Sequence, residues 1–352
     1  MSAEIKVLIL GVGSIGRRHL SNLRMISKER SMVLAIADPV AENREAAQKL
    51  GADEIYSSLD DALQGSSIDA ALVCTPNDLH LDHSRALLEA GVHVFVEKPM
   101  CTNAQNAEIL ADLAESSKRH VMVGCNLRFH PGVRAVSDAL VSNLIGRPLY
   151  ARAWFAHYLP NWRPGQDYRD SYSAHAEHGG GILLDAIHEP DYLISLFGPV
   201  KEVNGSLYRQ GDLNINVEDT AMYTLKHSQS GGLHSFVSNV HVDFLRRDKV
   251  RGCEVCGTDG TLVWRSSGKN PEHVSVSLYN ASTDAWTDLY VNDAYNPNDQ
   301  YVDEMLCFLK CLDKENLAPV NGPNEAGHVL DVLDAVRKSS AVGQSIPIVS
   351  SN

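Results

Sequence analysis

The first 125 residues alternate short apolar runs with amphipathic stretches, and this alternation limits the available folds more than any other feature. The apolar runs are too continuous for half-exposed strands, which favours strands buried on both faces. Strand, helix and strand at this spacing predict an α/β fold with a parallel, doubly wound sheet. The expected strands span 6–10, 32–37, 69–74, 92–97 and 120–124, and the expected helices span 14–27, 42–51, 79–91 and 103–118.

A glycine-rich turn lies directly after the first strand and opens the first helix, which is where a dinucleotide fingerprint has to lie. It reads Gly11-Val12-Gly13-Ser14-Ile15-Gly16. Gly11 allows the tight turn, Gly13 lets a pyrophosphate approach the backbone, and Gly16 lets helix and strand pack closely. The N–H groups of the helix N-terminus are the donors for the phosphates. The motif therefore predicts a bound dinucleotide.

Asp38 ends the second strand, where an acid is expected to bind the ribose 2′-hydroxyl of that dinucleotide. A carboxylate there repels a 2′-phosphate, and no basic residue follows it before Arg44. This arrangement favours NAD over NADP as the cofactor. The alternative for Asp38 is a turn residue preceding Pro39.

Two further segments follow later strands at the carboxyl edge of the predicted sheet, where ligands bind in such folds. They are CTPNDLH (74–80) and VEKP (96–99). Lys98 ends an otherwise apolar strand, so its ammonium group is expected to point toward the cofactor. There it would bind a substrate hydroxyl and stabilise the alkoxide that forms during hydride transfer. The alternative is an exposed lysine in a turn before proline.

Composition excludes several classes of function. The formal net charge is −13, which argues against a general affinity for nucleic acid or anionic membranes. The N-terminus MSAEIKVLIL resembles neither a signal peptide nor a transit peptide, and no apolar run reaches 18 residues. Seven scattered cysteines fit a reducing compartment, so we expect a soluble, cytoplasmic protein. Cys253 and Cys256 form a single CxxC without further ligands nearby, and no metal site is expected.

The second half of the chain carries a different pattern. Segments 149–159, 217–227, 231–242, 253–264 and 274–280 alternate apolar and polar residues. This is typical of an antiparallel sheet with one packed and one available face. We therefore predict two domains, 1–125 and 126–352. Late helices at 298–312 and 323–341 would pack on the second sheet or back on the first domain.

The segment GGGILLDAIHEPD (179–191) places three glycines before Asp185 and His188. The glycines suit a flexible lead-in, and the apolar spacing that follows predicts a helix. Two residues three apart lie on one side of a helix, so Asp185 and His188 can reach one pocket. Pro190 fits this helix poorly and can instead end a short first turn.

Three motifs of the chain can be compared with known families: GVGSIG, TPN followed three residues later by His80, and AGVHVFVEKP. Together they resemble the Gfo/Idh/MocA family of oxidoreductases, which includes glucose-fructose oxidoreductase and inositol dehydrogenase. The resemblance extends to the GGG segment and to GTDGTL, so it covers the whole chain. It implies an N-terminal Rossmann domain and a C-terminal α/β domain with a large open sheet facing a neighbouring subunit, in a homodimer or homotetramer. It also implies cofactor contacts from Thr75, Pro76, Asn77, His80, Glu97 and Lys98.

By the same resemblance His188 is the acid/base, Asp185 helps to hold the substrate hydroxyl, and Lys98 completes the catalytic set. The family spacing is Asp-x-x-x-His, whereas this chain has Asp-x-x-His, one residue shorter. When residues are counted backward from Asp191, His188 still aligns with the histidine of the family motif, whereas Asp185 is displaced by one residue. The shorter spacing therefore leaves open whether Asp185 contacts the substrate directly. Glu189 is a second carboxylate beside the histidine. The alternative for His188 is a helix-face histidine bonded to a backbone carbonyl.

Two loop segments rich in Arg, Trp, Tyr and His, 125–133 and 158–181, border the substrate in this family. Arginine binds carboxylate or phosphate groups, and aromatic faces pack on sugar rings. Loop packing and salt bridges are the alternative for each of these side chains. The candidates for substrate contact are Arg128, His130, Trp162, Arg163, Tyr168, Arg169 and Tyr172.

The sequence thus predicts an NAD-dependent enzyme that interconverts a secondary alcohol and a ketone on a sugar, sugar acid or nucleotide sugar. The amino-acid sequence of these loops resembles a bacterial branch of the family that is associated with surface-polysaccharide or sialic-acid-like sugars. The several arginines in the loops favour an anionic substrate. One alternative is redox-neutral chemistry, such as glycosidic cleavage, isomerisation or dehydration, in which NAD is recycled within the site. Another is a non-catalytic NAD-binding regulator, against which the presence of Lys98 and His188 argues.

Overall fold

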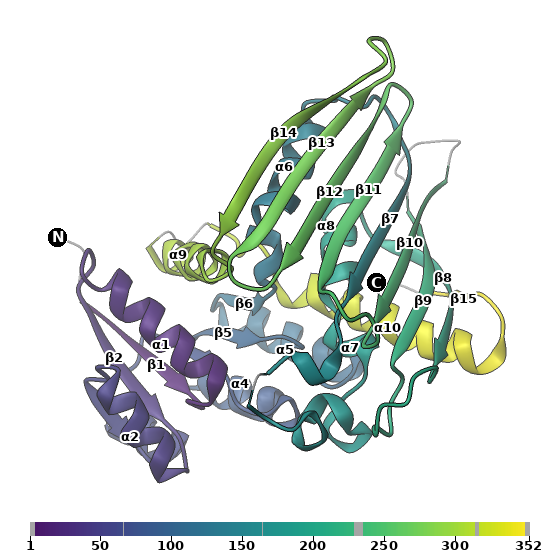
Figure 1. The fold of residues 1–352 in the computed structure, drawn as a ribbon. Coiled ribbons are helices and arrows are strands. Elements are labelled where there is room, and N and C mark those ends of the chain that lie inside the picture. The colour runs from purple at the N-terminus through teal and green to yellow at the C-terminus, as the bar shows by residue number, and fades with distance from the viewer. Residues whose placement is uncertain (1–3, 66, 164, 229–234, 314–316, 349–352) are drawn as a thin grey trace. The chain divides into compact units, whose positions relative to one another are not determined.

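The chain divides into two compact units in a computed structural model that describes residues 4–65, 67–163, 165–228, 235–313 and 317–348. Unit 1 comprises Met1–Asn126 with Asn298–Gly327, and unit 2 comprises Leu127–Pro297 with His328–Asn352. Figure 1 shows the helices and strands of both units.

Unit 1 is built on a six-stranded sheet of order β3-β2-β1-β4-β5-β6, in which every paired strand is parallel. Its central strands are mainly apolar, and Val7, Leu34 and Leu72 are fully buried. The strand order reverses between β1 and β4, which is the point where ligands bind in doubly wound sheets. The strands are β1 (Ile5–Leu10), β2 (Met32–Ala37), β3 (Glu54–Tyr56), β4 (Ala70–Val73), β5 (His93–Glu97) and β6 (Val121–Gly124).

Helices connect these strands. They are α1 (Ser14–Ile26), α2 (Ala41–Lys49), α3 (Leu59–Gly65), η1 (Asn77–Leu79), α4 (His80–Glu89) and α5 (Ala104–Ser117). The sequence pattern predicts α1, α2, α4 and α5 among them. A helix from late in the chain, α9 (Asp299–Asp313), packs on α1 and completes the unit. Arg30 binds Asp313 of α9 through two hydrogen bonds of 2.7 and 2.8 Å.

Unit 2 is built on a nine-stranded sheet of order β14-β13-β12-β11-β7-β10-β9-β8-β15. Its neighbours are antiparallel except for β7 and β10, which run parallel. The strands are β7 (Pro148–Ala156), β8 (Val200–Tyr208), β9 (Thr220–His227), β10 (Phe236–Asp243), β11 (Val250–Gly257), β12 (Gly260–Gly268), β13 (Glu272–Asn280), β14 (Ala285–Tyr295) and β15 (Ile346–Pro347). The fold class predicted from sequence, a parallel Rossmann sheet plus a large, mainly antiparallel one, is confirmed.

Helices cover one face of this second sheet (Figure 1). They are α6 (Pro131–Val141), α7 (Ile182–Asp185), α8 (His188–Phe197) and the later part of α10 (Pro323–Val342). On the covered face Trp264, Val255 and Leu225 are fully buried. The short turns η2 (Asn126–Phe129), η3 (Leu159–Asn161), η4 (Tyr168–Asp170), η5 (Tyr172–Ala174) and η6 (Ala176–His178) lie in the connections before α7.

The sequence pattern missed the strands β3, β8, β14 and β15 and the helices α3 and α6. The strand predicted over 231–242 is seen from Phe236, and residues 231–234 lie outside the described part of the chain. Cys253 and Cys256, three apart on β11, lie on opposite faces of the sheet because side chains alternate along a strand. All seven cysteines are free thiols. Among the described residues, no helix combines the length and apolarity needed to cross a bilayer.

Candidate active site

The glycine turn of unit 1 is closely packed on one side and open on the other. Gly11 has φ +85°, and a Cβ on it would lie 2.9 Å from the carbonyl oxygen of Cys74. A Cβ on Gly16 would collide with the carbonyl oxygen of Gly11. No atom of the described residues lies within 4 Å of the corresponding position on Gly13, so a ligand has room to approach the backbone there. The turn thus meets the steric requirements of a pyrophosphate site beside the first N–H groups of α1.

Asp38 follows β2 and is bound to this turn. Its Oδ2 accepts a 2.8 Å hydrogen bond from the N–H of Val12, and its Oδ1 accepts one of 2.9 Å from the N–H of Val40. Asn43 donates to both carboxylate oxygens at 3.2 Å. The Arg44 guanidinium, by contrast, donates to the carbonyl oxygen of Asp38 at 2.7 Å. The carboxylate that is expected to meet the ribose is therefore fixed relative to the glycine turn.

His80 joins the two other strand-end segments of unit 1. The residue is fully buried, and its ring nitrogens lie 2.9 Å from the carbonyl oxygens of Pro99 and Thr75. Burial lowers the pKa of His80, so the neutral ring donates to one carbonyl at a time. Thr75, partly exposed, is hydrogen-bonded to His83 at 3.0 Å, and Pro76 and Asn77 lie at the start of η1.

Glu97 anchors the lysine that follows it. Its Oε1 lies 2.7 Å from Nε2 of His19 on α1, and its Oε2 accepts a 3.1 Å hydrogen bond from the N–H of Lys98. Burial alone would raise the pKa of Glu97, but the hydrogen bond and charge of His19 outweigh it and lower the pKa. The side chain of Lys98 is partly exposed. Sequence reasoning missed His19, whose only signal was a histidine on the buried side of α1.

In unit 2 the three glycines before α7 permit close packing and unusual backbone angles. Gly179 and Gly181 have φ of +71° and +106°. A Cβ on Gly180 would collide with carbonyl oxygens of the preceding loop, and a Cβ on Gly181 would collide with the carboxylate of Glu218. The glycines therefore form a tight junction, and the predicted flexible lead-in is wrong.

Asp185 and His188 lie on two successive helices, so the predicted single helix through both residues is wrong. Asp185 is the last residue of α7, and His188 is the first residue of α8. Pro190 falls in the first turn of α8. Backbone N–H groups in the first turn of a helix have no hydrogen-bond partner within the helix, so a proline is tolerated there. Both residues are largely buried, at 7% and 9% exposure. The one-residue shortening of the motif coincides with this helix junction.

Tyr172 and Glu218 surround the α7 end of the site. The Tyr172 hydroxyl donates a 2.7 Å hydrogen bond to Oδ1 of Asp185, and the Arg163 guanidinium lies 5.2 Å from the Tyr172 ring centroid. Glu218 accepts a 3.1 Å hydrogen bond from the N–H of Leu183. Burial, with the charge of Asp185 adding to it, raises the pKa of Glu218. Glu218 was also missed from sequence, where it is one acid at the start of a predicted strand.

Two arginines bind the acidic residues of the first turn of α8. Arg128 donates to Asp191 through Nε at 2.9 Å and Nη2 at 2.8 Å. Arg251 of β11 donates to Glu189 at 2.8 Å. Both carboxylates are fully buried. The sequence suggested Arg128 for substrate contact, but in this structure its guanidinium group binds Asp191.

The other predicted substrate residues are distributed over several settings. His130 is 1% exposed and caps α6, with Nδ1 accepting from the N–H of Gly132 at 3.0 Å. Trp162 donates to the carbonyl oxygen of His157 at 2.9 Å. The Tyr168 hydroxyl accepts from the N–H of Asn214 at 3.1 Å, and Arg169 pairs with Asp167 at the surface.

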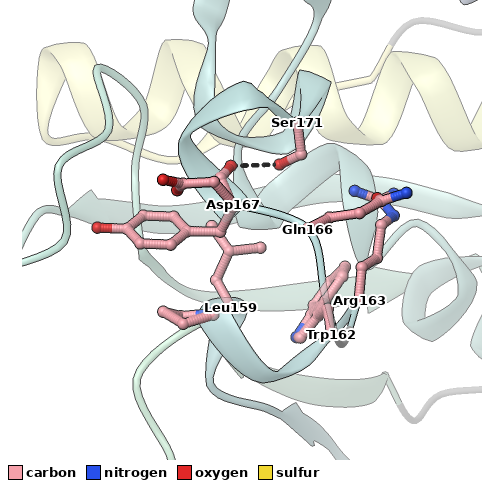
Figure 2. Close-up of a pocket in the computed structure, with 8 residues that line it drawn as sticks. Leu159, Trp162, Arg163, Gln166, Asp167 and Ser171 are labelled. Atoms are coloured by element: carbon pink, nitrogen blue, oxygen red, sulfur yellow. Dashed lines mark hydrogen bonds between the residues drawn. The ribbon is translucent and has the colours of Figure 1, made fainter.

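Figure 2 shows a small pocket formed by the loop after β7, with Trp162 and Arg163 on one side and Asp167 on the other. The hydroxyl of Ser171 donates to the carbonyl oxygen of Tyr168 at 2.6 Å and helps to hold the loop. The space inside is about 10 Å³, enough for roughly one water molecule. In this conformation the pocket is too small to hold a sugar.

Both halves of the sequence match domains of one family. Residues 5–125 match the domain described as "Oxidoreductase family, NAD-binding Rossmann fold", and residues 133–263 match the "GFO/IDH/MocA C-terminal domain". The chain belongs to the Gfo/Idh/MocA family. It is an NAD-binding oxidoreductase.

Relatives in this family match along nearly the whole chain. A 1,5-anhydro-D-fructose reductase of Ensifer adhaerens is 28% identical over 97% of each chain. A myo-inositol 2-dehydrogenase of Thermotoga maritima is 25% identical over 96% of each. The fold matches levoglucosan dehydrogenase, solved in complex with NADH and levoglucosan, with a TM-score of 0.85 at 20% identity, covering 98% of this chain and all of the other.

Proposed function

We propose that this oxidoreductase is an NAD-dependent dehydrogenase or reductase that interconverts a secondary alcohol and a ketone on a sugar, sugar acid or nucleotide sugar. The observation that carries the proposal is the pair of chemically complementary centres, one in each unit. In unit 1 Glu97 holds the backbone of Lys98, and in unit 2 His188 begins the helix that follows the one ending at Asp185. The names of the relatives, which act on anhydrofructose, inositol and levoglucosan, support a polyhydroxylated substrate.

The residues of unit 1 fit NAD. The open space at Gly13 and the N–H groups of Ser14, Ile15 and Gly16 suit the pyrophosphate. The fixed carboxylate of Asp38 suits the two hydroxyls of an adenine ribose and disfavours a 2′-phosphate. Thr75, Pro76, Asn77, His80, Glu97 and Lys98 would line the rest of the cofactor site at the carboxyl edge of the sheet.

Bound NAD supplies the hydride acceptor, and the chain supplies the charge and proton chemistry. Lys98 would donate a hydrogen bond to the substrate oxygen and stabilise its negative charge as the C–H bond breaks. His188 would accept the hydroxyl proton in oxidation and return it in reduction. Asp185, with one oxygen held by Tyr172, would orient the hydroxyl or the imidazole.

Substrate recognition is assigned to the loop between β7 and α7 and to the arginines near it. Arg163 stacked on Tyr172 is the best-placed pair, because Tyr172 also bonds Asp185. Trp162, Tyr168 and Arg169 would take part through movement of the loop that closes the small pocket in Figure 2. Arg128 and His130, predicted for the same role, have buried partners in the structure, which supports a scaffolding role for both.

We also propose that copies of the chain associate through the uncovered face of the second sheet. This face exposes Met222, Trp286 and Val291 at 39%, 56% and 51%. A hollow of about 390 Å³ lies across β7, β8, β9 and β10, lined by Trp154 and Met222 among others. Exposed apolar side chains on a broad sheet are typical of a protein interface, which supports a homodimer or homotetramer. The free state of all seven cysteines supports a cytoplasmic location.

The proposal is tested with the wild type, Lys98→Met and His188→Ala, assayed with NAD and a panel of sugars, sugar acids and nucleotide sugars. We expect NADH to accumulate with the wild type, and Lys98→Met to bind NAD normally while losing turnover. His188→Ala should lose the acidic limb of the pH–rate profile. Turnover without net NADH would favour the redox-neutral alternative, and unchanged turnover of either variant would remove that residue from the mechanism.

A further inference from the structure

The first turn of α8 contains an unusual concentration of buried charge. His188 opens the helix, and Glu189 and Asp191 follow it within the same turn. The side chains of both acids are fully buried. Each is bound by an arginine from a separate part of unit 2, so His188 lies next to two anchored carboxylates.

The Arg128–Asp191 pair fixes one side of this turn. Its two N–H groups and two carboxylate oxygens form parallel hydrogen bonds of 2.9 and 2.8 Å, and the arginine side chain is 5% exposed. A bidentate pair of this kind restrains both the position and the rotation of the carboxylate. Because Asp191 is three residues after His188, the restraint acts on the same side of the helix as the histidine.

The Arg251–Glu189 pair fixes the turn from the sheet. Arg251 belongs to β11, and its guanidinium carbon lies 4.0 Å from the ring centroid of Phe155 on the neighbouring β7. Stacking on the ring holds the guanidinium while its Nε donates to Glu189 at 2.8 Å. The residue directly after His188 is therefore bound to β11 through an arginine that stacks on the neighbouring β7.

Stability alone does not account for two such pairs. Removing two charges from water costs several kcal/mol per ion, and apolar residues of similar size often serve equally well or better. Buried ion pairs do supply a defined geometry, because an alternative packing would leave a charge unpaired. They also offset the negative charge that Glu189 and Asp191 would otherwise impose on the imidazole.

We propose that Arg128 and Arg251 are positioning residues for His188, acting through Asp191 and Glu189. The proposal rests on the acid/base role assigned to His188 above. The two pairs set the direction of the imidazole by fixing the first turn of α8, and they compensate the charges of the two acids in that turn. Among the described residues, Tyr192, Tyr223 and Cys253 also lie within the influence of the Glu189 charge. Burial raises the pKa of all three, so they remain neutral near pH 7.

The experiment compares the full-length protein with Arg251→Met, the double variant Arg251→Met/Glu189→Leu, and Arg128→Lys. Measurements are the unfolding midpoint, NAD affinity, kcat, KM and the pH–rate profile. Arg251→Met alone leaves Glu189 uncompensated, and we expect the acidic limb to move to higher pH. The double variant removes both charges, so the limb should return toward its wild-type position while kcat stays on the order of 10- to 100-fold low, since the imidazole is misdirected.

Arg128→Lys tests the same proposal if Arg251→Met and the double variant fail to fold. It keeps the charge but loses the bidentate geometry, so we expect a near-normal unfolding midpoint and KM with kcat about tenfold lower. The matched control is Arg246→Met, because Arg246 forms a similar two-bond pair with Asp248 at 3.0 and 2.8 Å on the exposed surface. We expect this control to change neither kcat nor the pH profile.

Wild-type kcat and pH profile in the double variant and in Arg128→Lys would overturn the positioning role. His188→Ala distinguishes this result from a failure of the proposed function. If His188→Ala abolishes turnover while the pair variants keep it, only the positioning role is wrong. If His188→Ala turns over normally, the acid/base assignment and the inference built on it both fail.

Discussion

The hydroxyl of Tyr172 donates a 2.7 Å hydrogen bond to Oδ1 of Asp185, and this bond joins the loop before the three glycines to the end of α7. Desolvation of the hydroxyl and the charge of Asp185 raise the pKa of Tyr172, so the phenol remains protonated. The phenol therefore keeps the proton that it donates in this bond. It is a direct link between the proposed substrate loop and the proposed acid/base pair.

Tyr172→Phe should lower kcat/KM by roughly 10- to 100-fold, because a hydrogen bond to a charged group contributes about 1.5–3 kcal/mol. The measurement is steady-state kinetics beside thermal unfolding. Tyr279→Phe is the matched control, since Tyr279 donates a bond of the same length to Asp284 at the exposed surface. Equal activities for the two variants would show that the Tyr172 bond has no part in turnover.

Asp38→Ser should shift cofactor preference from NAD toward NADP. The change removes the carboxylate that disfavours a 2′-phosphate and leaves Arg44, now bonded to the carbonyl oxygen of Asp38, close to the new phosphate position. We expect NAD affinity to fall about tenfold and NADP affinity to rise, measured by titration calorimetry. Since Asp38 also binds the N–H of Val12, a circular dichroism melt is needed to separate cofactor choice from loosening of the glycine turn. An unchanged ratio of the two affinities would contradict the assignment.

Glu272→Gln should destabilise the folded protein in a pH-dependent way. Glu272 is buried and binds Lys249 and Ser266, with His130 at 3.5 Å. Burial would raise its pKa, but the bonds from His130 and Lys249 outweigh it and lower the pKa to about 2. A lowered folded-state pKa means that the stabilisation is complete above the unfolded value near 4.5 and is lost as pH falls toward 2.

Near pH 7 the loss should be about 3 kcal/mol, partly because Lys249 is left without its counter-charge. Urea unfolding of wild type and variant from pH 7 to pH 2.5 measures the difference. The difference in unfolding free energy between wild type and variant should shrink steadily below pH 4.5, because the stabilisation from ionised Glu272 is lost as the pH falls. A difference that stays constant over this range would mean that the ionised pair does not stabilise the fold.

Local patterns in the sequence predicted the Rossmann unit well. The buried strands of unit 1 read as continuous apolar runs, and the glycine turn has its role because of backbone sterics within six residues. The second sheet was harder to predict, since β14 is exposed on both faces and carries no clean alternation. The helix junction at Asp185 and His188 was missed because an apolar pattern runs through both helices without interruption.

The sequence by itself determined the fold class, the family, the cofactor turn and the identities of Lys98, His188 and Asp185 as candidates. Only the tertiary structure decided what holds them. His19 and Glu97 are 78 residues apart, Arg128 and Asp191 are 63 apart, and Arg251 and Glu189 are 62 apart. Local sequence periodicity cannot predict such pairs. Burying a charge is costly unless it is paired, and here folding brings the partner from a distant part of the chain. Gly180 and Gly181 follow the same rule, since the groups that exclude a side chain there are carbonyl oxygens of the preceding loop and the carboxylate of Glu218.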